Sequence, residues 1–502
     1  MKIIACILLC TISSFAQTPN GPGGVQNTTG TSSLHQWYRA DLGITLAVGV
    51  VSAWADQSGY GNNLTGPAGF RPATVVDANL NNQTCVAYAG AQYFTSALNG
   101  PNVNNITIFL VARGTSYQSL IRFQNNAAVF VVYPWEFGGG RTFISSSDGG
   151  TASGIASGLV NNANNVGAAR YTINTVNGMQ TYLNGTLNAQ RTSVNSILPT
   201  QPFYSGRYNP GASEYPTCDV GEMIVYFSAL NDAEMIMVEN YLAAKFNCAL
   251  TSNDFYTMDN AANGNYDHDV AGIGRVNVSN LITDARGTGI VEILNPTGLG
   301  DGKYYLWGDD NGTLGHWNTA DYPVGLQGRL VRIWRGSMTG SIPSMDVRFD
   351  LTGLGPVTAS DLRLLVDMND NGIFSDETVA GGGVISGASL VAGNVYQFTG
   401  VSALTDHLRF TLGTINSTQT PLPIELLSFR ATPDASQVDL DWSTATETNN
   451  DYFTIERSTN GVDWSEIVRQ PGSGTTTSQV NYHAIDPNPF VGTSYYRLKQ
   501  TD

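Results

Sequence analysis

The sequence DVGEMIVYFSALNDAEMIMVENYLAAKF, residues 219–246, combines the pattern of a strand with that of a helix. Residues 220–227 are largely apolar and bounded by polar turns, which predicts a strand buried on both faces. Asn231 and Glu234 are three residues apart, which is the spacing of a helix capping box. We therefore expect the strand to end shortly before Asn231 and a helix to begin there.

Apolar residues continue through this helix at intervals of three or four. Met235, Val238, Leu242 and Phe246 therefore share one helical face. No other stretch of the sequence has so clear a helical pattern. We interpret residues 219–246 as the strand and helix that close a large β domain.

The composition predicts an all-β protein. A chain of 502 residues is too long for one compact core, and two to four domains are expected. Charged residues make up only 13 % of the chain, and its 55 glycines, with frequent Asn and Thr, suit short strands joined by tight turns. The net charge of −16 argues against nucleic acid as a partner, because phosphate binding needs clustered Lys and Arg.

The N-terminus has the anatomy of a secretion signal. Lys2 supplies the positive charge, residues 3–12 form a short apolar run, and residues 14–16 provide a cleavage site rich in small residues. We predict a signal peptide over residues 1–16, a disordered lead-in over 17–33 and a secreted or cell-surface protein. No later run is long enough to span a membrane.

Three cysteines follow the predicted signal: Cys85, Cys218 and Cys248. Their odd number prevents complete pairing within the chain. A Cys218–Cys248 disulfide would bracket the closing strand and helix, and three buried thiols are the alternative.

Residues 34–250 alternate short apolar or aromatic runs with Gly and Asn turns, as an antiparallel sandwich does. The Asn184-Gly185 pair predicts a two-residue hairpin turn. The order of WYRAD, WADQSGYGN, YLNG and residues 219–246 resembles a bacterial laminin-G-like, concanavalin-type jelly roll. This resemblance implies a lectin-like sandwich of the kind found in carbohydrate-binding or adhesive surface proteins. The fold also occurs in glycoside hydrolases and lyases, so it does not define the chemistry.

Residues 251–415 contain further short β-like runs, with the stretches HDVAGIGR, YYLWGDDNG and DMNDNGIFSDE. This region resembles an uncharacterised β domain that often follows the laminin-G-like domain in bacterial surface proteins. The resemblance brings no established activity. Residues 416–423, NSTQTPLP, are expected to form a linker.

Residues 424–502 resemble the fibronectin-III-like module of proteins exported by type IX secretion. The resemblance implies core positions for Trp442 and Tyr496, the latter as a tyrosine corner. The chain stops after the penultimate strand of that module, where the family has a last strand and a sorting domain. We therefore expect the module to be truncated.

The most specific ligand pattern lies in residues 367–377, DMNDNGIFSDE. Side-chain oxygens at positions one, three and five, with Gly at position six, are typical of a calcium loop. The predicted calcium ligands are Asp367, Asn369, Asn371, the carbonyl of Ile373, and Asp376. Position twelve departs from the pattern, because Thr378 replaces the usual Glu. A hairpin tip made by Asn, Asp and Gly is the alternative, and a bound calcium would be structural.

Two other stretches are candidates for ligand binding. Asp56 and Asn62, in DQSGYGN, can bind a ligand or bond their own loop. Tyr133, Trp135 and Phe137, in YPWEFGGGR, can stack on sugar rings or belong to the core.

Catalytic motifs are missing from the sequence, which has no GxSxG, HExxH, Walker or GxGxxG pattern and no Glu-x-Asp-x-x-Glu strand. We therefore predict a non-catalytic binding or adhesion protein whose partner is a glycan or another surface polymer. A glycoside hydrolase or lyase on the same fold, and a structural stalk protein, are the alternatives.

Overall fold

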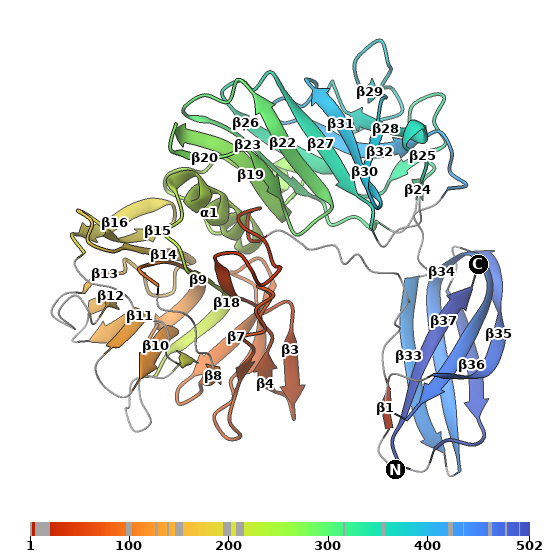
Figure 1. Cartoon of the computed structure of the whole chain (residues 1–502), viewed down its shortest axis with the longest axis horizontal. Helices are drawn as coiled ribbons and strands as arrows, with labels where there is room; N and C mark the ends of the chain where they lie inside the picture. The colour runs from red at the N-terminus through yellow and green to blue at the C-terminus, as the bar shows by residue number, and fades with distance from the viewer. Residues whose placement is uncertain are drawn as a thin grey trace.

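Figure 1 shows the computed structural model of the chain, which is built almost entirely of strands. The structure describes residues 3–5, 21–96, 103–125, 129–137, 140–145, 154–193, 202–206, 215–314, 317–352, 357–419, 425–434, 436–459, 464–476, 479–490 and 492–501. Its strands form three units, which we call the first sandwich (β2–β18), the second sandwich (β19–β32) and the third unit (β33–β37). The predicted all-β class is confirmed.

The first sandwich consists of two sheets with an apolar core between them. One sheet has the order β13 (Ile155–Ala156), β12 (Gly140–Ser145), β11 (Val129–Phe137), β10 (Ile121–Asn125), β17 (Phe203–Ser205), β8 (Phe94–Ser96), β5 (Leu64–Thr65), β4 (Val50–Trp54) and β3 (Ile44–Ala47). The other has the order β16 (Thr186–Arg191), β15 (Met179–Leu183), β14 (Asn165–Thr172), β9 (Asn105–Ser116), β18 (Thr217–Tyr226), β7 (Gln83–Ala89) and β6 (Ala73–Asp77), with β2 (Leu34–Arg39) also on β18.

Strand β18 is buried on both faces, as its sequence predicts. Met223 and Val225 point into the core of the first sandwich, whereas Ile224 and Tyr226 belong to a second apolar cluster on the outer face of the same sheet. This outer cluster continues across the neighbouring strands, because Ile224 lies opposite Phe109 of β9. A strand with alternate side chains in two cores has no face turned to solvent, which explains the apolar run from Met223 to Tyr226.

Helix α1 (Asp232–Phe246) covers this outer face, and the predicted capping box is confirmed. The Asn231 side chain accepts hydrogen bonds from the amides of Ala233 and Glu234, at 2.9 and 3.1 Å. The Glu234 carboxylate accepts from the Asn231 amide at 2.8 Å. Every residue of α1 except Asp232 and Glu234 is buried. The helix is therefore buried on all sides, whereas its periodicity predicted burial of one face.

The second sandwich explains the wider burial, because it packs on the opposite side of α1 (Figure 1). One of its sheets has the order β20 (Asn280–Ile282), β19 (His268–Asn277), β23 (Lys303–Asp309), β26 (Trp334–Thr339), β32 (Arg409–Thr414), β25 (Gly328–Leu330) and β24 (Trp317–Asn318), with β28 (Leu362–Val366) on β32 and β29 (Val384–Ile385) on β28. The other has the order β21 (Asp284–Arg286), β22 (Val291–Thr297), β27 (Ser344–Asp350), β31 (Val395–Val401) and β30 (Ser389–Ala392). Two 3₁₀ turns, η3 (Ala261–Asn263) and η4 (Ala359–Asp361), lie between strands.

The predicted disordered lead-in is wrong for residues 21–33. Val25 is fully buried in the cluster around α1, and Gly23 forms a β-bridge with Ala271 of the second sandwich. A Cβ atom on Gly23 would lie 2.6 Å from the carbonyl oxygen of Met237, so the backbone of this segment lies directly against the helix. Glycine here permits close packing, and no local pattern distinguishes it from the glycines of a flexible segment.

The third unit contains β33 (Glu425–Asp434), β34 (Gln437–Ser458), β35 (Ser465–Thr476), β36 (Val480–Asp486) and β37 (Ser494–Thr501). Trp442 and Tyr496 are buried in its core, as predicted, and the Tyr496 hydroxyl donates to Asp486 at 2.8 Å. Strand β1 (Ile3–Ala5), from the predicted signal peptide, pairs in parallel with β37. The part of the chain that the structure describes contains no helix with the length and apolar character needed to span a membrane.

The Cys218–Cys248 disulfide is not present in the structure. Cys218 packs in the core of the first sandwich, whereas Cys85 and Cys248 belong to the cluster around α1 on the other side of the sheet. All three cysteines are buried thiols. The sheet itself separates the two sulfurs, although both lie near the ends of the closing strand and helix in the sequence.

Glu222 is a fully buried carboxylate on β18 that faces α1. It accepts hydrogen bonds from the Trp37 indole, from the Tyr241 hydroxyl at 3.0 Å and from the Lys245 ammonium at 3.0 Å. Lys245 also contacts Asp41 at 3.0 Å. These contacts fix the position of α1 on the sheet.

We expect Lys245→Met to lower the free energy of unfolding by roughly 3 kcal/mol, because it leaves Glu222 buried without its cation. The double variant Lys245→Met/Glu222→Gln should lose clearly less than the sum of the two single changes. Urea unfolding of the four proteins measures this coupling. If the two single losses of unfolding free energy simply add in the double variant, the Glu222–Lys245 pair does not fix the helix on the sheet.

Candidate functional site

The loop that contains Asp56 and Asn62 is bonded to itself. The Asp56 carboxylate accepts from the amides of Trp37, Ser58 and Asn62, each at 2.9 Å. The Asn62 side chain donates to the carbonyl of His35 at 2.9 Å. The polar side chains of Asp56 and Asn62 thus form hydrogen bonds within the protein. This agrees with the interpretation that they bond their own loop rather than a ligand.

The aromatic stretch in β11 does not offer Tyr133 to a ligand. Tyr133 is fully buried in the core of the first sandwich, where burial raises the pKa of its hydroxyl. Its assignment as a sugar-stacking residue is therefore wrong, since an inward-facing side chain of a sandwich fills the core. The side chains of Trp135 and Phe137 lie outside the part of the chain that the structure describes.

The structure brings the predicted calcium ligands together in one loop after β28. Asp367, at its base, is fully buried and accepts from the amides of Asn371 and Gly372, at 3.2 and 2.8 Å. The Arg409 guanidinium contacts the same carboxylate at 3.2 Å. Asp367 therefore serves the turn, whatever else the loop binds.

The exposed half of this loop is different. The Asp376 carboxylate accepts from the side-chain amides of Asn369 and Asn371, at 3.1 and 2.8 Å, and the amide of Ile373 donates to Asn371 at 2.8 Å. The side-chain oxygens of Asn369 and Asn371 accept from the backbone amides of Asn371 and Ile373, at 3.1 and 2.8 Å, so their nitrogens face Asp376. No group of three or more His, Cys, Asp or Glu residues suited to a metal occurs in the described ranges.

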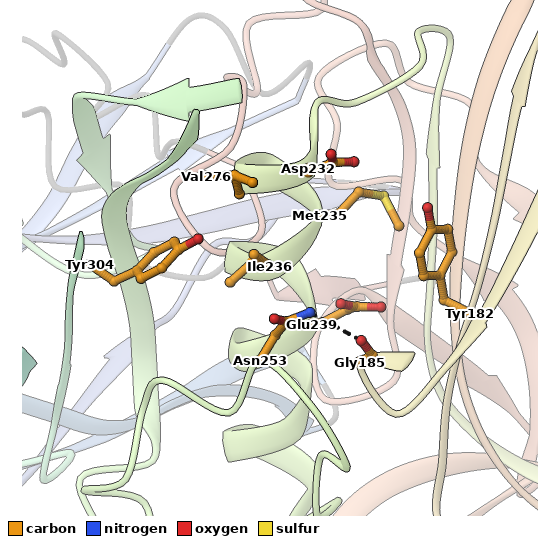
Figure 2. A pocket seen from close by; sticks show the side chains of 9 residues that line it. All are labelled: Tyr182, Gly185, Asp232, Met235, Ile236, Glu239, Asn253, Val276 and Tyr304. Carbon is orange, nitrogen blue, oxygen red and sulfur yellow. Dashed lines mark hydrogen bonds between the residues drawn. The ribbon is translucent and has the colours of Figure 1, made fainter. Parts of the chain in front are cut away.

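A pocket of ≈ 240 Å³ lies where α1, the β15–β16 hairpin and the second sandwich meet (Figure 2). The predicted Asn184-Gly185 turn is confirmed, and both residues have positive φ angles, of 47° and 81°. This turn brings Gly185 to the rim of the pocket, opposite Asn253. The pocket is lined by Tyr182, Gly185, Asp232, Met235, Ile236, Glu239, Asn253, Val276 and Tyr304.

Two tyrosines line the pocket on opposite sides of α1. Figure 2 shows Tyr182, from β15, on one side and Tyr304, from β23, on the other, with α1 between them. Tyr304 stacks on Phe255 with ring centroids 4.1 Å apart, which fixes one of its two faces. The guanidinium of Arg170 lies 5.7 Å from the centroid of the Tyr182 ring and holds the hydroxyl by a 2.9 Å hydrogen bond.

Glu239 is the unusual residue of this pocket. It is 2 % exposed, and its Oε1 atom has no hydrogen-bond partner among the described residues. Its carboxyl group points toward the side of the pocket formed by Gly185 and Tyr182 (Figure 2). Burial raises the pKa of Glu239 to about 8, although Arg170 acts in the opposite direction. Glu239 is therefore a neutral acid at pH 7.

A second charged cluster lies near the C-terminal half of α1. The stretches HDVAGIGR and YYLWGDDNG contribute to the neighbouring strands β19 and β23, which place His268 opposite Asp309. The Asp267 carboxylate, 2.7 Å from the His268 ring, raises the pKa of the histidine, and burial raises that of Asp309 to about 8. Arg332 lies 3.5 Å from Asp309. The groups of this cluster partner one another, which indicates a structural role.

Residues 289–401 of the second sandwich match a family model described as "Domain of unknown function (DUF8202)". The match lies inside the region whose sequence resembles an uncharacterised β domain. No curated protein matches the sequence.

Several solved structures resemble parts of this chain, among them domain 4 of AbnA, a GH43 extracellular arabinanase from Geobacillus stearothermophilus in complex with arabinotriose. It is 14 % identical, with a TM-score of 0.33, over 42 % of this chain and 98 % of that domain. A Trypanosoma rangeli sialidase is 13 % identical, with a TM-score of 0.29, over 48 % of this chain and 37 % of the enzyme. A GH54 α-L-arabinofuranosidase is 11 % identical, with a TM-score of 0.30, over 61 % of this chain and 69 % of that one. The chain thus spans about a third of the sialidase.

We expect Glu239→Gln to stabilise the protein increasingly as the pH rises from about 5 to 8. The folded wild type keeps the Glu239 proton up to about pH 8, whereas the unfolded chain releases it near the ordinary value of 4.5. Wild-type stability therefore falls with rising pH in this window, by up to about 1.4 kcal/mol per unit, and the variant lacks this loss. Urea unfolding at several pH values measures the difference.

The control is Glu466→Gln, which makes the same change at an exposed position outside the pocket. A difference between Glu239→Gln and wild type that stays constant from pH 5 to 8 would contradict a buried neutral acid at position 239.

Proposed function

We propose that this protein is an exported, non-catalytic glycan-binding protein and that the pocket in Figure 2 holds the sugar. The observation that carries the proposal is Glu239, whose buried Oε1 atom has no hydrogen-bond partner among the described residues, in a pocket that Tyr182 and Tyr304 also line. A sugar presents hydroxyl groups to polar side chains and apolar ring faces to aromatic ones. The pocket volume of ≈ 240 Å³ is below the range of about 300–1,000 Å³ for drug-sized ligands and suits a single sugar unit.

The arrangement of acids supports binding over hydrolysis. Most glycoside hydrolases use two carboxyl groups on either side of the scissile bond, about 5 to 9.5 Å apart. In this pocket Asp232 forms an ion pair with Arg170 at 2.8 Å, which leaves Glu239 as a single acid. A hydrolase or lyase would release shorter sugars from a bound polysaccharide, and chromatography of the incubated ligand tests this alternative.

The cellular setting of the proposal comes from the sequence. The signal-like residues 1–16 and the resemblances to laminin-G-like and type IX export modules support a place outside the cell or on its surface. A glycan is the polymer most accessible there. A stalk protein with no ligand is the remaining alternative.

We expect Tyr182→Ala to weaken glycan binding at least tenfold, because it removes one wall of the pocket. The measurement begins with a glycan array on the whole protein and continues with calorimetry on the best ligand. Tyr60→Ala is the matched control, since this partly exposed tyrosine belongs to the Asp56 loop and should not affect binding. An effect at Tyr60 without one at Tyr182 would move the site to that loop.

We also propose that the exposed half of the loop after β28 binds calcium in a structural role. The side chains of Asn369, Asn371 and Asp376 are its ligands, because they already converge on one another through the 3.1 and 2.8 Å hydrogen bonds to Asp376. To bind the ion, both side-chain amides would rotate by 180° and give up the hydrogen bonds that their oxygens accept from the amides of Asn371 and Ile373. The two amide oxygens and the carboxylate would then be hard donors of the kind that calcium prefers. A bound ion would hold the two sides of this turn together.

We expect 1 mM calcium to raise the melting temperature relative to chelator, because an ion that binds only the folded state stabilises it. Asp376→Ala should abolish the shift, since it removes the one charged ligand. The exposed Asp451→Ala is the control and should keep the shift. Overlapping melting curves of the wild type with and without calcium would leave the loop as a hydrogen-bonded turn.

A further inference from the structure

Once Glu239 has released its proton, the pocket in Figure 2 offers acceptors but few available donors. The side-chain amide of Asn253 donates to the Gly185 carbonyl at 3.2 Å, and the Tyr182 hydroxyl donates to Gln180 at 3.1 Å. Glu239 Oε1 receives no hydrogen bond from any described residue. A ligand that donates hydrogen bonds would therefore complement this pocket better than one that accepts them.

The charged groups around the pocket also favour a cationic ligand over an anionic one. Its titratable carboxyl groups are Asp232 and Glu239, and none of its lining residues is Lys, Arg or His. The neighbouring Arg170 is already engaged, by Asp232 and the Leu230 carbonyl at 2.8 Å each and by Tyr182 at 2.9 Å. No cation of the described chain forms an ion pair with Glu239, so a cationic ligand would supply the missing partner.

We propose that the pocket selects a sugar with a protonated amino group over the same sugar with a hydroxyl or N-acetyl group at that position. An ammonium group has three donors and no acceptor, which matches the ionised Glu239 carboxylate in this pocket. Compared with the ammonium group, an N-acetyl group is uncharged and bulkier, and a hydroxyl group is uncharged and has one donor in place of three. This inference rests on the proposed glycan-binding function of the same pocket.

Pairing with an ammonium group requires Glu239 to release its proton. Below about pH 8 the free protein holds this proton, so binding of a cationic sugar displaces it. Affinity should then rise about tenfold per pH unit while the amine stays protonated. The titratable or charged groups that face Glu239 or share its pocket are Arg170, Asp232, Tyr133, Tyr182 and Tyr304.

Calorimetry on the full chain tests the proposal with tetramers of glucosamine, N-acetylglucosamine and glucose that share one linkage. We expect the glucosamine tetramer to bind at least tenfold more tightly than the other two at pH 6.5, and its affinity to fall about tenfold at pH 5.5. Glu239→Gln should remove both the preference and the pH dependence. Glu234→Gln, on the same helix, keeps a capping side chain outside the pocket and should behave as wild type.

The possible failures are distinguishable. Equal affinity for the three tetramers, with an effect of Tyr182→Ala, would overturn selection of the amine and keep the glycan site. An affinity for neutral sugars that falls as the pH rises would show that Glu239 donates its proton to the ligand, which also overturns amine selection. No binding to any glycan, or binding that Tyr182→Ala does not change, would overturn the proposed function itself.

Discussion

The burial of α1 between two sheets is the constraint on which the other features of the structure depend. One face of the helix completes the outer surface of β18 and its neighbours, and the other packs against β19 and β23. The Glu222–Lys245 pair at 3.0 Å fixes the helix on its sheet, and both partners are buried. Because a buried ion pair is costly to break and specific in geometry, it sets the position of the helix more strictly than apolar contacts do.

This arrangement also places the candidate site. Side chains on α1 that would face solvent in a single sandwich lie at a junction, where the β15–β16 hairpin and β23 add the remaining walls. Glu239 is buried between α1 and the first sandwich, beside Arg170 and Tyr182, and its raised pKa follows from that burial. The pocket itself belongs to both sandwiches, because Val276 and Tyr304 of the second sandwich also line it.

The buried polar groups of this protein differ in whether the fold satisfies their hydrogen bonds, and this difference distinguishes structural sites from a candidate binding site. Asp56 and Asp367 accept two or more hydrogen bonds from their own loops, so folding satisfies them. Glu239 has an atom that folding buries and leaves without a partner among the described residues. Such an atom destabilises the protein unless a ligand compensates it, which distinguishes Glu239 as the candidate binding group.

Local sequence patterns were sufficient to predict the all-β class, the buried strand β18, the capping box at Asn231 and the Asn184-Gly185 hairpin turn. These features depend on periodicity and on neighbours within four residues, which a sequence displays directly. The role of Glu239, the ordered packing of residues 21–33 and the separation of Cys218 from Cys248 emerged only from the folded chain. Each of these depends on which distant segments a side chain packs against, and only the packing of the sheets and of α1 in the folded chain decides that.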